Sequence, residues 1–227
     1  MAIVVGVAPP ASAGDSTGNL QVRLGLTGIL FDESVKSVNT DLGDLKPAGA
    51  NAKVGNVAVP TATITYFFTP NWAVEAICCT AKITAKGTGL LAPYGDLADA
   101  WVLPPIVTLQ YRFDRVHNFQ PYVGAGVQWI HYWPGKADNL LSAASVDIED
   151  SFGLALQAGV DYDLGEGWSL GLDVKKTWLD TTVKWYGTPL GDVSSKIDLD
   201  PWWLTASLGY RFNVEDLFAS RSVAPIK

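Results

Sequence analysis

The chain has 227 residues, of which 48% are hydrophobic and only 17% are charged, and its mean hydropathy is +0.16. This composition is apolar for a soluble domain and too polar for a bundle of membrane helices. It suits a β-barrel that alternates lipid-facing and interior-facing residues. The net charge is −7 and basic residues are not clustered, which argues against nucleic-acid binding.

The first thirteen residues are similar to the end of a secretory signal. Residues 3–8 form a short apolar core and Ala11-Ser12-Ala13 is an A-x-A cleavage pattern, although Arg23 is the first basic residue. An unstructured arm is the alternative interpretation. We expect export with cleavage after Ala13. The predicted divisions are a signal remnant at 1–13, a barrel at 14–212 and a C-terminal tail at 213–227.

Period-two alternation of apolar and polar residues, the pattern of β-strands, recurs along the chain. It is clearest at 151–164 and 202–212, where aromatic residues stand near both ends. The uncharged run 54–74 contains Gly55, Pro60 and Pro70, which favour strand and turn over a membrane helix. The eight predicted strands are 19–31, 57–68, 72–84, 101–113, 119–133, 151–164, 168–186 and 197–212.

The predicted connections alternate between long and short. Short turns on one rim and long loops on the other are typical of an outer-membrane barrel, and an even strand count places both termini at the periplasmic side. The sequence therefore predicts an all-β, eight-stranded antiparallel transmembrane barrel with short periplasmic turns and long extracellular loops. The long loops are 32–56, 85–100, 134–150 and 187–196, and the short turns are 69–71, 114–118 and 165–167.

Aromatic residues gather at both ends of the predicted strands, as expected for girdles at the two headgroup levels. A soluble lipocalin-like barrel is the alternative, but it does not explain this sorting. Lys176 interrupts the apolar face, and either snorkelling or a bulge accounts for it. The lower set, near the short turns, is Tyr66, Phe68, Trp72, Tyr111, Phe113, Phe119, Tyr162, Trp168, Tyr210 and Phe212. The upper set, near the long loops, is Phe31, Trp101, Trp129, Trp133, Phe152, Trp178, Trp185 and Trp202.

Polar residues on the interior face predict a plug. An eight-stranded barrel holds only side chains or one small ligand, and buried charges there need partners. We expect Arg23 and Arg112 to pair with Glu75 and Asp161 in the periplasmic half. A satisfied plug without a transport role is equally consistent for each residue alone. The predicted interior residues are Arg23, Glu75, Gln110, Arg112, Gln128, Gln157, Asp161 and Asp173, with Lys175 if the register is unbroken.

Two features predict where a solute enters and leaves. Proline donates no ladder hydrogen bond, so Leu103-Pro104-Pro105 indicates either a lateral opening or a strand that begins after the prolines. The loop segment 138–144 has the composition of a short helix. Leu140 and Leu141 either roof the barrel mouth or take part in simple loop packing.

No catalytic, metal or cofactor pattern is present. Cys78 and Cys79 are strand neighbours that point to opposite faces, so neither a disulfide nor a metal site is expected. His117 and His131 lack a nucleophile arrangement. We therefore expect no enzyme; a lipid-modifying barrel is the less favoured alternative. The predicted outer rim is acidic, either solvated or bridging divalent cations to lipopolysaccharide, through Asp147, Glu149, Asp150, Asp192, Asp198 and Asp200.

Several local motifs resemble the OmpW family of small outer-membrane barrels over roughly residues 19–212. Their order and spacing carry the resemblance. They are Tyr66-Phe67-Phe68, Asn71-Trp72-Ala73-Val74-Glu75, Leu103-Pro104-Pro105, Gln110-Tyr111-Arg112-Phe113, Pro121-Tyr122-Val123-Gly124-Ala125-Gly126, Gln157-Ala158-Gly159-Val160-Asp161-Tyr162, Asp200-Pro201-Trp202 and Gly209-Tyr210-Arg211-Phe212.

The resemblance implies a monomeric barrel with a narrow hydrophobic lumen. It also implies contact with membrane lipids, lipopolysaccharide and the assembly machinery, and passive uptake of small hydrophobic molecules with lateral release near Pro104-Pro105. A structural barrel or surface receptor is the alternative function. Two features depart from the family: residues 213–227 follow the final aromatic, Phe212, and Cys78-Cys79-Thr80-Ala81 lacks a proline that members often carry.

Overall fold

The computed structural model describes residues 18–40, 43–44, 50–89, 92, 95–134, 145–188 and 191–215. The predicted signal remnant, the loop residues Leu140 and Leu141, and the tail beyond 215 lie outside the described residues. Within the described part, no helix has the length and apolar character needed to cross a membrane.

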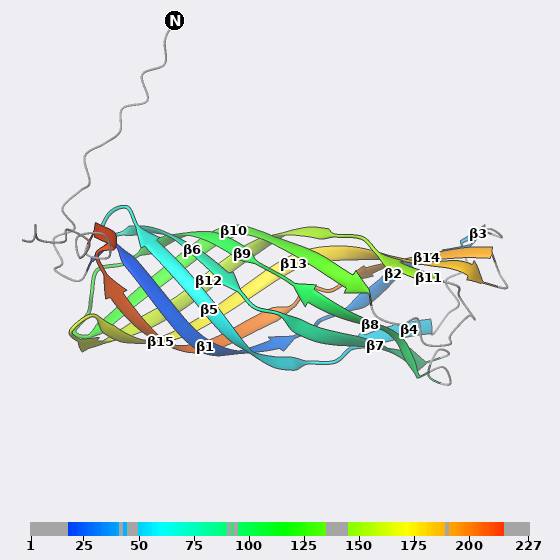
Figure 1. Cartoon of the computed structure of the whole chain (residues 1–227), viewed down its shortest axis with the longest axis horizontal. Coiled ribbons are helices and arrows are strands. Elements are labelled where there is room, and N and C mark those ends of the chain that lie inside the picture. Colours follow the sequence, from blue (N-terminus) through cyan, green and yellow to red (C-terminus); the bar gives the residue numbers. More distant parts are fainter. Residues whose placement is uncertain are drawn as a thin grey trace, which may run out of the picture.

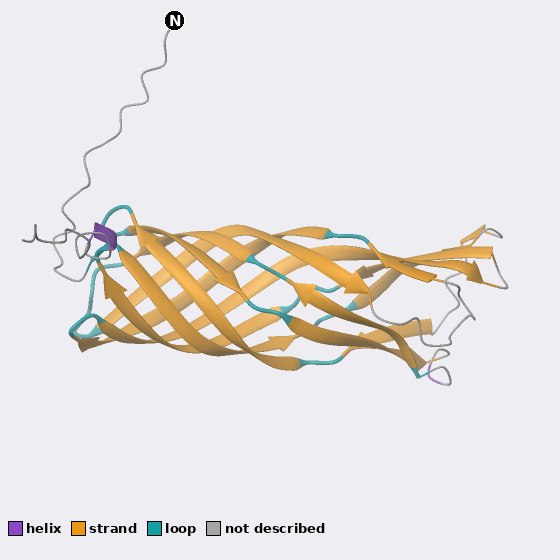
Figure 2. Cartoon of the chain, viewed as in Figure 1, coloured by secondary structure: helices purple, strands orange, loops and turns teal. Residues whose placement is uncertain are grey.

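Strands make up nearly all of the described chain (Figure 2). Their bounds are β1 Leu20–Leu30, β2 Ser34–Thr40, β3 Gly43–Asp44, β4 Ala50–Val54, β5 Val57–Phe67, β6 Trp72–Cys78, β7 Ala81–Gly89, β8 Asp96–Leu103, β9 Ile106–Arg112, β10 Phe119–Pro134, β11 Ser145–Ile148, β12 Ser151–Gly165, β13 Trp168–Thr188, β14 Gly191–Asp198 and β15 Trp202–Phe212.

Eight of these strands close into an antiparallel barrel (Figure 1). The ring runs β1, β5, β6, β9, β10, β12, β13, β15 and back to β1. The closing pair joins the first and last barrel strands along their full length, from Leu20 opposite Phe212 to Leu30 opposite Trp202. The predicted eight-stranded barrel is therefore confirmed. Its first strand begins, and its last strand ends, at the rim of short turns.

The two faces of the wall differ in the way that a membrane barrel requires. In β15, Leu204 and Leu208 are exposed, whereas Trp203, Thr205 and Arg211 are buried. Apolar side chains thus cover the outside and polar ones fill the lower interior, the reverse of a soluble ligand-binding barrel. The lipocalin-like alternative does not fit this arrangement.

Aromatic rings surround the rim of short turns and contact one another. Tyr111 lies between Trp72 and Phe113, with ring centroids 5.2 Å apart on each side in edge-on geometry. The prediction that Trp185 belongs to the upper girdle is wrong, because its side chain is buried inside the structure above the barrel. Strand β13 runs on beyond the membrane level, and the alternation places Trp185 on its inner face.

Lys176 is accommodated without a bulge. The β12–β13 register is unbroken from Gly153 opposite Leu179 to Asp163 opposite Ser169, so Lys176 points outward. Its ammonium donates to the carbonyl oxygen of Asp200 and lies 5.1 Å from the centre of the Trp202 ring. This is snorkelling, and the bulge interpretation is wrong.

Where the structure describes them, the predicted long loops are largely strand, which is the main error of the sequence interpretation. One extension sheet joins β3, β2, β14, β13 and β11, and the other joins β4, β7, β8 and β10 (Figure 1). Ile197, predicted to begin the last barrel strand, belongs to β14 instead. These segments are short and contain many charged residues, a composition that is typical of loops. They are nevertheless strands, because they pair with neighbouring strands.

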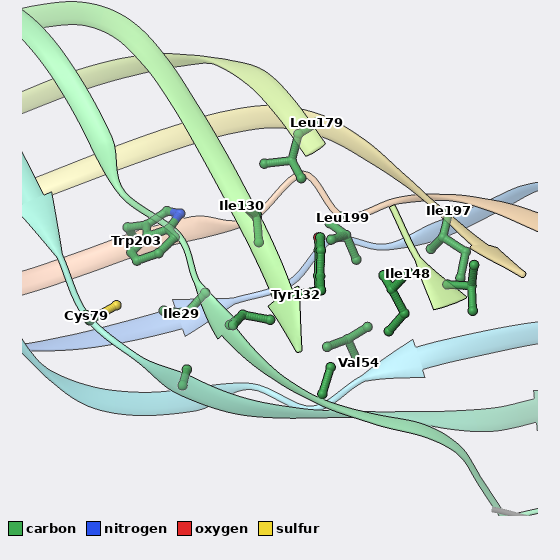
Figure 3. Packing of buried hydrophobic residues seen from close by; sticks show 14 of the residues in the cluster. Ile29, Val54, Cys79, Ile130, Tyr132, Ile148, Leu179, Ile197, Leu199 and Trp203 are labelled. Atoms are coloured by element: carbon green, nitrogen blue, oxygen red, sulfur yellow. The ribbon is translucent and has the colours of Figure 1, made fainter. Parts of the chain in front are cut away.

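The buried hydrophobic cluster lies at the junction of barrel and extension. Figure 3 shows Trp203, Ile29 and Ile130 together with Tyr132 and Leu199, drawn from strands far apart in sequence. The apolar part of the interior is therefore the upper part, above a polar lower half.

Candidate functional site

A charged network closes the lower half of the barrel. Three cations and three carboxylates meet there, all of them inward-facing on barrel strands, and we call them with their two glutamines the plug. The plug consists of Arg23, Arg112, Lys175, Glu75, Asp161, Asp173, Gln110 and Gln157. Its six charges sum to zero, and every one of them has an opposite charge as a partner.

Glu75 is the hub of the plug. Its Oε2 accepts hydrogen bonds from Arg23 Nη1 at 2.9 Å and Gln110 Nε2 at 2.8 Å. Its Oε1 accepts from Gln157 Nε2 at 2.8 Å and lies 3.0 Å from Lys175 Nζ. With Thr65 Oγ1 at 3.4 Å from Oε2, five donors from five strands surround this fully buried carboxylate, which is why it is tolerated.

Asp161 and Asp173 complete the network on the opposite wall. Asp161 Oδ2 accepts from Arg23 Nη2 at 2.6 Å and also from Arg112. Asp173 accepts from Lys175 Nζ at 2.5 Å and from Gln157 Nε2 at 2.6 Å. Both of the expected arginine–carboxylate pairings are present in the structure.

Tyr122 lies within the plug, and the sequence interpretation missed it. Arg112 lies over its ring, 4.5 Å from the centroid, and its hydroxyl donates to Asp173 at 3.0 Å. The ring fills the space beside Gly159, where an added Cβ would fall 2.4 Å from the ring. The sequence did carry a signal for it: Tyr122 is two residues before Gly124 on β10, so the alternation places both on the inward face.

The floor of the plug is a second layer that sequence did not indicate. The guanidinium of Arg211 stacks 3.7 Å from the ring centre of buried Phe67, and Arg112 lies over the same ring at 5.3 Å. Cation–π stacking lets an aromatic ring cover two arginines. These side chains narrow the periplasmic end of the lumen to a hollow of about 30 Å³, lined by Gln21, Phe67 and Arg211 among others.

Two small cavities lie above the plug and are lined mainly by apolar side chains. The lower, of about 20 Å³, is bounded by Ile29, Ala81, Pro104 and Trp203, among others. The upper, of about 50 Å³, lies between the two extension sheets. Both touch Ile83, Tyr132 and Leu199, so they follow one another along the axis.

Gln128 departs from its predicted place in the plug. It is buried inside the barrel as expected, but its amide has no hydrogen-bond partner among the described residues. It lies one interior position below Ile130, which lines the lower cavity. The other seven predicted interior residues, and Lys175, are all in the network.

The barrel wall is interrupted beside the lower cavity. Pairing of β6 with β9 ends at Ile77 opposite Ile106, and β7 with β8 begins at Ala81 opposite Val102. Leu103, Pro104 and Pro105 lie in the gap, and Pro104 lines the cavity. Strand β9 does begin directly after the prolines, at Ile106, but the prolines do not lie at a loop rim, since β8 precedes them and the chain stays beside β10 on its other edge.

A second unpaired edge adjoins the first. Strand β5 pairs with β6 only as far as Ala62 opposite Cys78, whereas its pairing with β1 continues to Val57. In the described chain, Cys79-Thr80 has no ladder partner on either side. We call this stretch, with the facing Leu103-Pro104-Pro105, the wall break. Cys79 faces inward beside it, and Figure 3 shows its sulfur to the lower left of Trp203 in that view.

Several acidic residues of the outer rim have partners within this chain. Glu149 lies 2.5 Å from Lys184, Asp198 lies 2.7 Å from Lys36, and Asp150 accepts a hydrogen bond from His131 Nδ1 at 2.8 Å. Among the described residues, no group of three histidines, cysteines or acids is placed to hold a metal. These pairs favour the interpretation of the rim as a solvated charged surface.

Comparison with known proteins agrees with this architecture. The family model described as OmpW family matches residues 16–212. Outer membrane protein AlkL of Ectopseudomonas oleovorans is 32% identical over 90% of this chain and 86% of its own. The dibenzothiophene metabolism operon protein PahQ of Pseudomonas aeruginosa is 28% identical over 84% of this chain and 87% of its own.

Among solved structures, the outer membrane protein OprG from Pseudomonas aeruginosa superposes with a TM-score of 0.78 at 28% identity, covering 88% of this chain and 99% of that one. The match in fold extends over nearly the whole relative, and the family model spans the barrel from its first strand to its last. The chain therefore belongs to the OmpW family, and it is an outer-membrane β-barrel of bacteria.

Proposed function

We propose that this protein is a passive, monomeric channel, without catalysis, through which small hydrophobic molecules enter the outer membrane and leave sideways through the wall break. One observation carries the proposal: the apolar cavities end on a charge-balanced plug at the height where the wall loses its ladder. The name of PahQ, which belongs to a dibenzothiophene metabolism operon, adds support for an apolar solute.

The plug favours a sideways route over a straight one. A straight path would take the solute through Glu75, Arg23 and Lys175, which hold one another in short hydrogen bonds. An apolar molecule cannot replace those bonds, and separating buried charges costs several kcal/mol, on the order of 3–5 for one lost partner. A solute that leaves through the wall into the lipid separates none of these charge pairs.

The wall break supplies an exit of suitable chemistry. Unpaired backbone at membrane depth is tolerated only where protein or a polar cavity covers it. Here protein covers it on the lumen side, where Ile29, Ala81 and Trp203 lie beside Pro104, and the facing edge of β5 contains Pro60, which also lacks a donor. Three residues beside the wall break are prolines and have no backbone N–H to donate. A simple shift of the strands therefore cannot restore the missing hydrogen bonds.

Filling the lower cavity tests the proposal. Ala81 is buried and lines this cavity, so Ala81→Phe should lower uptake of a small apolar solute by outer-membrane vesicles to the level of vesicles without the protein. Ala206→Phe is the matched control, because Ala206 is an exposed residue of the same size on the lipid face of β15. Heat-modifiable migration on gels establishes that both variants are folded.

Two outcomes would contradict the channel. If wild-type protein, folded in vesicles, fails to accelerate uptake of alkanes, arenes and esters alike, the structural or receptor function is favoured. If Ala81→Phe transports as well as Ala206→Phe, the cavity is not on the route.

A further inference from the structure

Three buried side chains between the plug and the lower cavity have polar atoms without partners. They are Gln128, Thr177 and Trp203, whose Oε1 and Nε2, Oγ1 and Nε1 have no hydrogen-bond partner among the described residues. Gln128 and Thr177 are 0% exposed and Trp203 is 2% exposed. Leaving a buried donor or acceptor unpaired costs free energy, so such a group calls for a partner. We call these three residues the polar belt.

The polar belt lies at about one height around the wall. Gln128 pairs with Gly153 of β12, and Thr177 of β13 pairs with Ala155, one interior position lower. The Thr177 amide in turn donates to Pro201, and Trp203 is one interior position below Pro201 on β15. Because the strands of a barrel are tilted, positions of equal height descend in register from strand to strand. The belt is therefore a ring segment.

This height is also that of the cavity floor. Trp203 lines the lower cavity, and so does Ile130, the interior residue directly above Gln128. Pro104 lines the same cavity at the wall break. Of the belt, Trp203 itself lines the cavity, and Gln128 lies one interior position below the lining residue Ile130, with the interrupted wall beside them.

The chemistry of the belt and the plug selects a neutral head group. The belt offers an amide donor and acceptor, a hydroxyl and an indole donor, and it carries no charge. Below it, the charges of Arg23, Arg112 and Lys175 are matched by Glu75, Asp161 and Asp173. A carboxylate or ammonium ion entering here would be buried without a counter-charge, which is strongly unfavourable.

We infer that the polar belt binds the single neutral polar group of an otherwise apolar solute, the hydroxyl or carbonyl of an alcohol, ketone or ester, through Gln128, Thr177 and Trp203. This inference rests on the proposed channel and names the solutes it prefers. The head group is held at the cavity floor while the apolar chain lies against the wall break. An alkane passes the same cavity without being retained there.

A matched pair of solutes separates head-group recognition from transport. Uptake of n-octane and 1-octanol by outer-membrane vesicles is measured for wild-type protein and for Gln128→Leu. We expect the ratio of octanol to octane uptake to fall about three- to tenfold in Gln128→Leu, the effect of one lost hydrogen bond. Thr177→Val should lower the ratio as well, by less. Thr205→Val is the control, because that hydroxyl is already bonded to Thr27 at 2.8 Å.

A direct binding measurement does not depend on uptake. In ¹⁵N–¹H spectra of the protein in detergent, the side-chain amide signal absent from Gln128→Leu identifies Gln128. It should shift with added 1-octanol or 2-octanone and stay in place with n-octane. An unmoved signal and an unchanged uptake ratio, with both solutes transported, would overturn the belt while leaving the channel intact. A shifted signal without any uptake would overturn the channel and support the belt.

Discussion

At the scale of single residues, the lower half of the barrel depends on matched buried charges. Glu75 is surrounded by Arg23, Lys175 and two glutamines, and it has no access to water. Such a group stabilises its neighbours as much as they stabilise it, because each would otherwise be an unpaired charge in a medium of low polarity.

Glu75→Gln should therefore destabilise the barrel strongly. The change keeps the shape of the side chain but leaves Arg23 and Lys175 short of a counter-charge, and we expect a loss of about 3–5 kcal/mol in the free energy of unfolding. Urea unfolding in lipid vesicles measures it. Glu166→Gln in the exposed β12–β13 turn is the control and should change this free energy by less than about 0.5 kcal/mol. Equal effects in the two variants would contradict the hub role of Glu75.

At the scale of elements, the decisive feature is that two barrel strands are each interrupted. Strand β6 stops at Cys78 and resumes as β7 at Ala81, and β8 stops at Leu103 and resumes as β9 at Ile106. The interruptions face each other, so the missing hydrogen bonds accumulate in one part of the wall. A single proline on one strand would weaken one pair; two consecutive prolines remove a donor from each edge of the strand.

Restoring these donors should close the wall. The double variant Pro104→Val, Pro105→Val returns two backbone N–H groups, and we expect severalfold slower uptake of apolar solutes with the barrel still folded. Pro121→Val is the matched control: Pro121 lies in β10 within the closed part of the ring, opposite Val160. Unchanged uptake in the double variant, with folding confirmed by gel migration, would refute lateral release at this position.

At the scale of the whole molecule, the chain is a short barrel that carries two sheets beyond the membrane. Exposed ion pairs connect neighbouring strands of these sheets. Lys184 holds the pKa of Glu149 below its ordinary 4.5, and Lys196 holds the pKa of Asp180 below its ordinary 3.8, in both cases chiefly through a side-chain hydrogen bond. The barrel itself depends on interior pairs that are shielded from solvent.

These shifts predict that the extension loosens in acid before the barrel does. A carboxyl whose pKa is lowered in the folded state contributes stability above its unfolded pKa and loses it as pH falls through the folded pKa. For Glu149 and Asp180 this window lies below about pH 4. Hydrogen exchange at pH 3 and pH 6, corrected for intrinsic rates, should show faster relative exchange in β11 and β14 and little change in β1 and β15. Uniform change along the chain would contradict the prediction.

Local pattern was enough to predict most of the barrel. Period-two alternation at residues 151–164, the three short turns and the sorting of aromatic rings are all readable within a few residues, because side-chain direction alternates strictly along a strand. The inward residues of the plug followed from the same alternation. Extension strands such as β2 and β14 were missed, because each is a strand only through pairing with the other, and the Ser195 hydroxyl donates to the carbonyl oxygen of Ser37, 158 positions away.

The sequence by itself thus determined the fold class, the membrane setting, which residues face the interior and where prolines interrupt strand pairing, since each depends on residue type and spacing alone. Only the tertiary structure decided which charges pair, that Gln128 stands apart from them, and that Pro104 meets a second unpaired edge at β5. The physical reason is register: Arg23 finds its carboxylates 52 and 138 residues away, and tilt and closure of the barrel bring those positions to one height.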